Sequence, residues 1–168
     1  MLAVASVLLL SACGSPATHN SADVAFAQGM VPHHEQALEM TELVASRTEN
    51  AHVIDLAARI SKAQKPEIDR MNGWLKDWGA PVKAESHSSH GHSDTHGMVD
   101  LGNLAELDGT EFDRQWLSLM IQHHRGAVEM ARKHLAAGTD PETRKLAQDV
   151  ITLQEKEISE MESLLPQG

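Results

Sequence analysis

The strongest constraint on the fold of this chain is an internal duplication. The stretch MVPHHEQALEM at positions 30–40 returns as MIQHHRGAVEM at positions 120–130, 90 residues later. Without any gap, the same offset aligns residues well outside the motif, including Asp23 with Asp113, Leu56 with Leu146, Glu67 with Glu157 and Met71 with Met161. A repeated unit of about 55 residues predicts a core built from two copies of one small element.

Each copy has the pattern of a helical hairpin. Apolar residues recur at helical rather than alternating spacing, as at Ile60, Ile68 and Met71. Ala, Leu, Met, Glu and Lys are common, which also favours helices. We therefore predict an all-α four-helix bundle made of two duplicated hairpins, residues 20–79 and 110–168, joined by a flexible linker over residues 80–109. Capping signals place the four helix starts near Asn20, Asn50, Thr110 and Asp140.

Residues 1–13 have the features of a bacterial lipoprotein signal peptide. The first twelve residues are apolar and lead into Leu10-Ser11-Ala12-Cys13, which resembles a lipobox, and Cys13 is the only cysteine in the chain. No Lys or Arg precedes the apolar run, although a signal peptide normally has one there, and a chance cysteine is the alternative. We predict a lipoprotein anchored to the membrane through Cys13 and exposed outside the cytoplasm, in the periplasm or at the cell surface.

The composition narrows the classes of function. With 14 basic and 24 acidic residues, a formal net charge of -10, the chain lacks the basic surface that nucleic-acid binding requires. It holds 11 histidines and 8 methionines but no tyrosine. If Cys13 carries lipid, no thiolate remains, so any soft-metal chemistry depends on methionine.

The repeated motif places four metal donors on one face of a helix. At about 100° per residue, the two methionines and two histidines of each copy fall within about 120° of one another. A lone buried histidine or methionine is usually ordinary core, but burying adjacent histidines twice costs free energy unless they find partners. The predicted ligands are Met30, His33, His34 and Met40 in the first copy and Met120, His123, His124 and Met130 in the second.

Ligand softness selects the metal. Thioether sulfur favours Cu(I) and, by the same softness, silver, whereas imidazole accepts both copper oxidation states and zinc. Because no thiolate is available, a closed structural zinc site fits poorly, and calcium or magnesium would require oxygen ligands. We therefore predict copper, mainly as Cu(I) with Cu(II) also accommodated, and silver as a mimic.

The second helix of each hairpin repeats further polar and sulfur-containing residues. Met71 and Met161 either add sulfur ligands or simply fill the core. Glu67 and Glu157 either orient the imidazoles or lie on solvated helix faces, and we expect the solvated position. The same expectation holds for Gln64 and Gln154.

The linker is a separate candidate for metal binding. Its histidines stand among Ser and Gly, a composition that either captures metal loosely or serves as a polar spacer. The residues concerned are His87, His90, His92, His96 and Met98.

The M-x2-HH-x2-A-x2-M pattern, present in both hairpins, resembles the domain-of-unknown-function 305 family (DUF305). The resemblance implies a ferritin-like fold. Because some periplasmic members of that family are implicated in copper binding and resistance, it also implies a metal-binding role for the repeated Met and His residues.

Several functions are compatible with these features. The one we favour is a protein without enzymatic activity that sequesters copper, confers resistance or hands copper to a partner protein. A ferritin-like di-iron oxidoreductase needs paired Glu-x-x-His motifs, but only Glu49 and His52 match and the second copy has no counterpart. A metal-free histidine catalyst would need a nucleophile and an orienting acid, to which no spacing points. A structural or interaction module is the remaining alternative.

Overall fold

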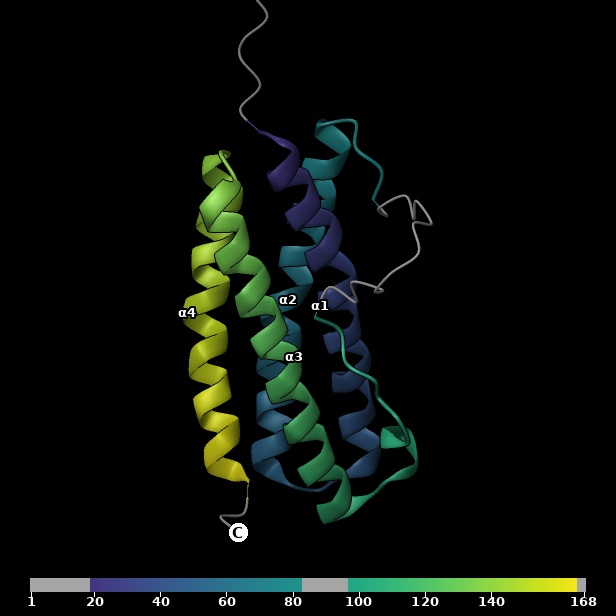
Figure 1. Ribbon diagram of the computed structural model, residues 1–168. Coiled ribbons are helices and arrows are strands. Elements are labelled where there is room, and N and C mark those ends of the chain that lie inside the picture. The colour runs from purple at the N-terminus through teal and green to yellow at the C-terminus, as the bar shows by residue number, and fades with distance from the viewer. Residues whose placement is uncertain (1–18, 83–96, 166–168) are drawn as a thin grey trace, which may run out of the picture.

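Four long helices make up the molecule in the computed structural model, which describes residues 19–82 and 97–165 (Figure 1). These helices are α1 (Ser21–Arg47), α2 (Ala51–Asp77), α3 (Gly109–Ala137) and α4 (Pro141–Leu164), and a short 3-10 helix, η1 (Leu104–Glu106), precedes α3. The described ranges contain no strand. The predicted all-α bundle of two helical hairpins is therefore confirmed.

Three of the four predicted helix starts are confirmed by their caps. Asn20 accepts hydrogen bonds from the backbone at the start of α1, Asn50 does so for α2, and Asp140 does so for α4. Helix α3 begins at Gly109, one residue before Thr110, but its N-cap residue is Asp108, so the predicted cap at Thr110 was wrong. The Asp113 carboxylate instead accepts a hydrogen bond of 2.8 Å from the Asn50 side chain.

The helices pack as two antiparallel hairpins, α1 with α2 and α3 with α4, and the hairpins meet mainly through α1 and α3. Because the Asn20 side chain donates to the Ala137 carbonyl at 2.9 Å, the start of α1 lies at the end of α3. At the opposite end of the bundle, Arg47 pairs with Asp108, just before α3. The two copies of the repeated motif, in the middle of α1 and of α3, therefore lie opposite each other on antiparallel helices (Figure 1).

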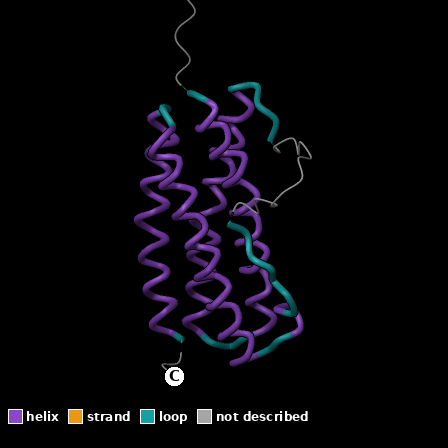
Figure 2. The backbone as a smooth tube through the Cα atoms, viewed as in Figure 1, coloured by secondary structure: helices purple, strands orange, loops and turns teal. Residues whose placement is uncertain are grey.

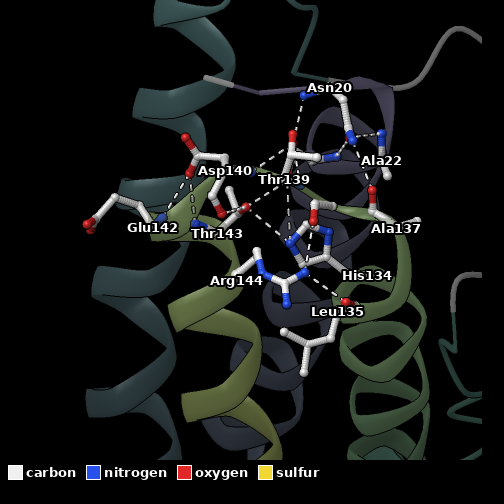
Figure 3. Close-up of polar contacts among 12 residues, drawn as sticks. Asn20, Ala22, His134, Leu135, Ala137, Thr139, Asp140, Glu142, Thr143 and Arg144 are labelled. Atoms are coloured by element: carbon white, nitrogen blue, oxygen red, sulfur yellow. Dashed lines mark hydrogen bonds and ion pairs between the residues drawn. The ribbon is translucent and has the colours of Figure 1, made fainter. Parts of the chain in front are cut away.

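A buried carboxylate fastens the start of α1 to the turn between α3 and α4, and Figure 3 shows Asn20 and Ala22 of the first segment beside Thr139 and Thr143 of the second. Asp23 has no solvent exposure and accepts hydrogen bonds from the backbone N–H groups of Thr139 and Asp140 and from the Thr143 hydroxyl. Burial by itself would raise the pKa of Asp23, but these bonds and one from the Asn20 N–H lower it on balance.

His134 completes this buried group. Its Nε2–H donates to the Thr143 hydroxyl at 3.1 Å, and its ring stacks on Phe26 with 4.3 Å between centroids. A Cβ atom on Gly138 would collide with the His134 ring, so only glycine fits at this turn. The sequence did not mark His134, because Val44 stands at the equivalent position of the first copy.

The second described part of the connection between α2 and α3 begins at Gly97, which lies against Gly126 of α3. We call residues 97–103 the strap: it runs as a loop alongside the helices and leads into η1 (Figure 2). Val99 and Leu101 are partly buried against the core, and Leu104 in η1 has no exposed surface. The predicted flexible linker over 80–109 thus includes a packed segment, since Val99 and Leu101 bury apolar surface against the bundle.

Candidate metal centre

The four motif histidines meet in the middle of the bundle. His33 and His34 project from α1 and His123 and His124 from α3, and none has any exposed surface. The rings of His33 and His123 touch, with 3.7 Å between their centroids. Each of them lies 6.3 Å from the ring of its neighbour in sequence.

Two carboxylates on the outer helices hold one histidine of each pair. The Nε2–H of His34 donates to Glu67 Oε2 at 2.8 Å, and that of His124 donates to Glu157 Oε2 at 2.9 Å. Both bonds join residues 33 apart, so the duplication reproduces them in each hairpin. The expectation that Glu67 and Glu157 lie on solvated faces was wrong, because helical spacing turns each carboxylate toward the facing histidine.

These bonds leave ring nitrogens free inside the core. The Nε2–H of His123 donates to the His33 carbonyl at 2.9 Å. With Nε2 protonated in His34, His123 and His124, the lone pair lies on Nδ1. Those three Nδ1 atoms and both ring nitrogens of His33 are buried and have no hydrogen-bond partner among the described residues.

Burial keeps the imidazoles of His33, His123 and His124 uncharged. It lowers the pKa of His33 to about 3, and the adjacent His34 and His124 add to the shift. Burial also lowers the pKa of His123, with His33 as the next cause. For His124, burial outweighs the opposing bond to Glu157, so its pKa is lowered as well. Neutral imidazole is the form in which a ring nitrogen binds a metal.

The predicted methionine ligands lie in two clusters of packed side chains, and the duplication relates one cluster to the other. One cluster contains Met30 and Met71, with the partly buried Met130 packed against it. The other contains the three residues at the equivalent positions, Met120, Met161 and Met40. Each cluster therefore draws methionines from both copies of the motif, because α1 and α3 run in opposite directions.

Met130 and Met40 stand at equivalent positions of the motif but differ in burial. Met40 has no exposed surface, whereas Met130 is half-buried and lines a cavity of about 200 Å³. Phe112 and Trp116 lie in the same cluster as Met40, and Trp116 also donates to the Met40 carbonyl. The equivalent positions beside Met130 hold the smaller Ala22 and Phe26, which leave the cavity open.

Two buried amides lie on the same helix faces as the carboxylates. Gln64 and Gln154 are each 2% exposed, so the expectation of a solvated position was wrong for them also. Both amide atoms of Gln64 and the Gln154 oxygen have no hydrogen-bond partner among the described residues. Helical spacing explains their burial, because each lies seven residues before a buried methionine, Met71 or Met161.

Some predicted residues are not part of this centre. Met98, in the strap, is 38% exposed. Within residues 19–82 and 97–165, no three His, Cys, Asp or Glu side chains gather in a way that could hold a metal ion. The remaining predicted residues, His87, His90, His92, His96 and Cys13, lie outside the described ranges.

The sequence pattern that defines the family described as "Domain of unknown function (DUF305)" matches residues 23–165. The chain belongs to this family. Its fold is similar to that of a presumed secreted DUF305 protein of Streptomyces coelicolor, with 35% identity, a TM-score of 0.76, and coverage of 86% of this chain and 90% of the other.

A second similar structure is the Cu(II)-bound form of a protein named CopM. It is 34% identical to this DUF305 chain, with a TM-score of 0.73, and the match covers 84% of this chain and 94% of CopM. CopM structures with Cu(I), with silver and without metal are also similar.

A viral relative shares only part of the DUF305 chain. The uncharacterized protein L153 of Acanthamoeba polyphaga mimivirus is 42% identical over 53 residues, which are 32% of this chain and 35% of that protein. The matched segment therefore spans about a third of the viral protein, and its name carries no functional information.

Proposed function

We propose that this protein is a non-enzymatic copper-binding lipoprotein outside the cytoplasm, where it sequesters copper, confers resistance or passes copper to a partner protein. The observation that carries the proposal is the group of buried imidazole nitrogens without hydrogen-bond partners. Unpaired polar atoms in a core cost free energy, and a bound metal ion would offset that cost. Fully buried methionines of both clusters supply the soft sulfur atoms that favour Cu(I) and silver.

The carboxylates support the same assignment. A histidine that binds metal through one nitrogen usually donates its other N–H to a carboxylate or carbonyl, which fixes the ring and raises its basicity. His34 with Glu67 and His124 with Glu157 have this arrangement. In each histidine the lone pair of Nδ1 is then available to bind a metal ion. We propose that the ligand set includes methionine sulfur, because the described residues hold no group of three His, Cys, Asp or Glu side chains that could bind a metal ion by itself.

The similarity to CopM supports copper in particular. CopM is known with Cu(I), Cu(II) and silver bound, and it is 33–34% identical to this chain over most of both sequences. The di-iron alternative finds less support, because Glu49 and His52 are exposed at the start of α2 and do not face the interior.

We extend the proposal to the attachment of the protein to a membrane. Within the described ranges no helix is long and apolar enough to cross a bilayer. We propose Cys13, at the end of the lipobox-like stretch Leu10-Ser11-Ala12-Cys13, and its lipid as the anchor. Replacing Cys13 with serine is expected to move the protein from the membrane fraction to the soluble fraction, and an unchanged membrane fraction would exclude the anchor.

Anaerobic titration with Cu(I) against a chromogenic chelator tests copper binding. The substitutions His33→Leu and His123→Leu, made together, remove the two touching imidazoles without leaving Glu67 or Glu157 unpaired. We expect the number of tightly bound Cu(I) ions per protein to fall. A variant with His52→Leu, an exposed position outside the centre, is the matched control and should bind as the unaltered protein does.

A third variant separates the bundle from the linker. Replacing His87, His90, His92 and His96 with asparagine leaves the proposed bundle site intact, so tight Cu(I) binding should persist. If that variant loses all binding while the His33/His123 variant keeps it, the bundle is not the copper site. Circular dichroism of each variant verifies that the helices are retained.

A further inference from the structure

The strap forms one wall of the metal centre. Its first residue, Gly97, lies against His33: a Cβ atom on Gly97 would lie 3.3 Å from His33 Nε2. Gly97 itself has a positive φ of 76°, which glycine adopts without strain. Of the four central histidines, His33 alone has both ring nitrogens without a hydrogen-bond partner among the described residues, and it is the one that the strap covers.

One side chain of α1 holds the strap in place. The side-chain amide nitrogen of Gln36, Nε2, donates to the Val99 carbonyl at 2.9 Å, and the Val99 N–H donates to the side-chain oxygen of Gln36, Oε1, at 3.0 Å. Gln36 thus makes the two hydrogen bonds that a neighbouring β-strand would make, although the strap has no strand partner in the described structure. Both bonds depend on this one partly buried residue.

On α3 a glycine, Gly126, leaves the space that the strap occupies. Gly97 and Gly126 are in such close contact that a Cβ atom on Gly126 would lie 2.7 Å from the Gly97 carbonyl oxygen and 2.8 Å from its Cα. Gly126 is the duplicate of Gln36, 90 residues later. At this one position of the repeat, one copy therefore holds the strap and the other copy makes room for it.

Among the described residues around the histidines, the strap is a loop, whereas α1 and α3 are continuous helices. The four histidines have no exposed surface, so an ion can reach them only if some part of the wall moves. Parting α1 from α3 would break apolar packing, because both core clusters contain side chains of the two helices. Releasing the first residues of the strap breaks the two Gln36 bonds, exposes the partly buried Val99 and uncovers His33, while Leu104 can stay buried in the core.

We propose that the strap is the gate of the metal centre, with Gln36 as its latch and Gly126 as its seat. Opening of residues 97–100 exposes the His33 ring to solvent, and the frequency of opening sets the rate at which a soft metal ion enters and leaves. This inference rests on the proposed function for its metal, but the movement itself does not depend on a metal.

Two variants open the gate by different means. Gln36→Leu keeps the size of the side chain and removes both hydrogen bonds, whereas Gly126→Ala forces Gly97 away from its seat. Gln122→Leu, an exposed glutamine one turn before Gly126, is the matched control. Thermal unfolding of the metal-free variants shows whether each one still folds, and either gate variant alone suffices for the test.

The first measurement uses no metal. Diethylpyrocarbonate modifies accessible neutral imidazole, and mass spectrometry of the peptide resolves His33 from His34. We expect the rate of His33 modification to rise about tenfold in Gln36→Leu. A tenfold change corresponds to a loss of about 1.4 kcal/mol from the stability of the closed strap, which two hydrogen bonds can account for. It should rise in Gly126→Ala also and stay unchanged in Gln122→Leu.

The second measurement uses Cu(I). Stopped-flow transfer of Cu(I) from the loaded protein to an excess of chelator should accelerate about tenfold in Gln36→Leu, with unchanged stoichiometry. If the unaltered protein binds no Cu(I), the proposed function fails, and the modification rates still decide whether the strap opens. If it binds Cu(I) and both gate variants match Gln122→Leu in both measurements, the gate is wrong and the copper site stands.

Discussion

Glu67 and Glu157 determine which nitrogen of their histidines is free. Each carboxylate binds the Nε2–H of the facing imidazole, so Nδ1 carries the lone pair inside the core. The same side chain on a solvated face would have no such effect. The chemical role of His34 and His124 thus depends on residues that the histidine motif does not contain.

The substitutions Glu67→Gln and Glu157→Gln test this dependence. Glutamine keeps the shape but loses the charge that raises the basicity of the ring, so the affinity for Cu(I) should fall by about 10- to 100-fold. Competition with a chelator of known affinity measures the change. Glu35→Gln, an exposed residue of α1, is the control, and equal affinity of all three variants would show that the carboxylates do not act on the ligands.

At the scale of helices, residues at equivalent positions of the two copies do not always make equivalent contacts. Asp23 and Asp113 are equivalent, yet Asp23 is fully buried and fastens α1 to the α3–α4 turn, while Asp113 is partly exposed and accepts one bond from Asn50. The stability of the bundle should therefore depend far more on the first aspartate than on the second.

Asp23→Asn is expected to destabilise the protein by at least about 2 kcal/mol, because an amide group would turn a donor toward the buried donors of Thr139, Asp140 and Thr143. Urea denaturation followed by circular dichroism measures the loss. Asp113→Asn is the matched substitution in the other copy and should cost below about 1 kcal/mol. Equal losses in the two variants would contradict the role given to Asp23.

At the scale of the whole molecule, the buried histidines make the metal-free fold sensitive to acid. The pKa of a histidine is near 6.5 in the unfolded chain, but His33 has a folded value of about 3, and those of His123 and His124 are also lowered. Between these values the unfolded chain binds protons that the folded protein does not bind. The contribution of these groups to stability is therefore present above about pH 6.5 and is lost as the pH falls toward 3.

The free energy of unfolding of the metal-free protein should consequently decrease between pH 6.5 and pH 4, by up to about 1.4 kcal/mol per pH unit for each such histidine. Asp23, whose pKa is lowered from 3.8, contributes to acid sensitivity only below this window. Urea denaturation in the presence of a chelator measures the trend. The His33→Leu/His123→Leu variant should show a flatter dependence, and an unaltered slope would mean that these rings are not the cause.

The sequence by itself determined the fold and the identity of the central residues. The offset of 90 residues and the helical spacing of the apolar positions were enough to predict two hairpins, because both are periodic properties of the chain. The motif also predicted that each pair of histidines, His33 with His34 and His123 with His124, lies on the buried face of its helix. Spacing within one helix fixes the face on which a side chain lies.

Only the tertiary structure decided how the two copies combine. The antiparallel packing of α1 against α3 brings His33 onto His123 and distributes the methionines of each motif between two clusters. It also turned Glu67 and Glu157 inward and placed the strap over His33. These contacts join residues far apart in the sequence, and their geometry depends on how helices pack, which periodicity within a single helix does not specify.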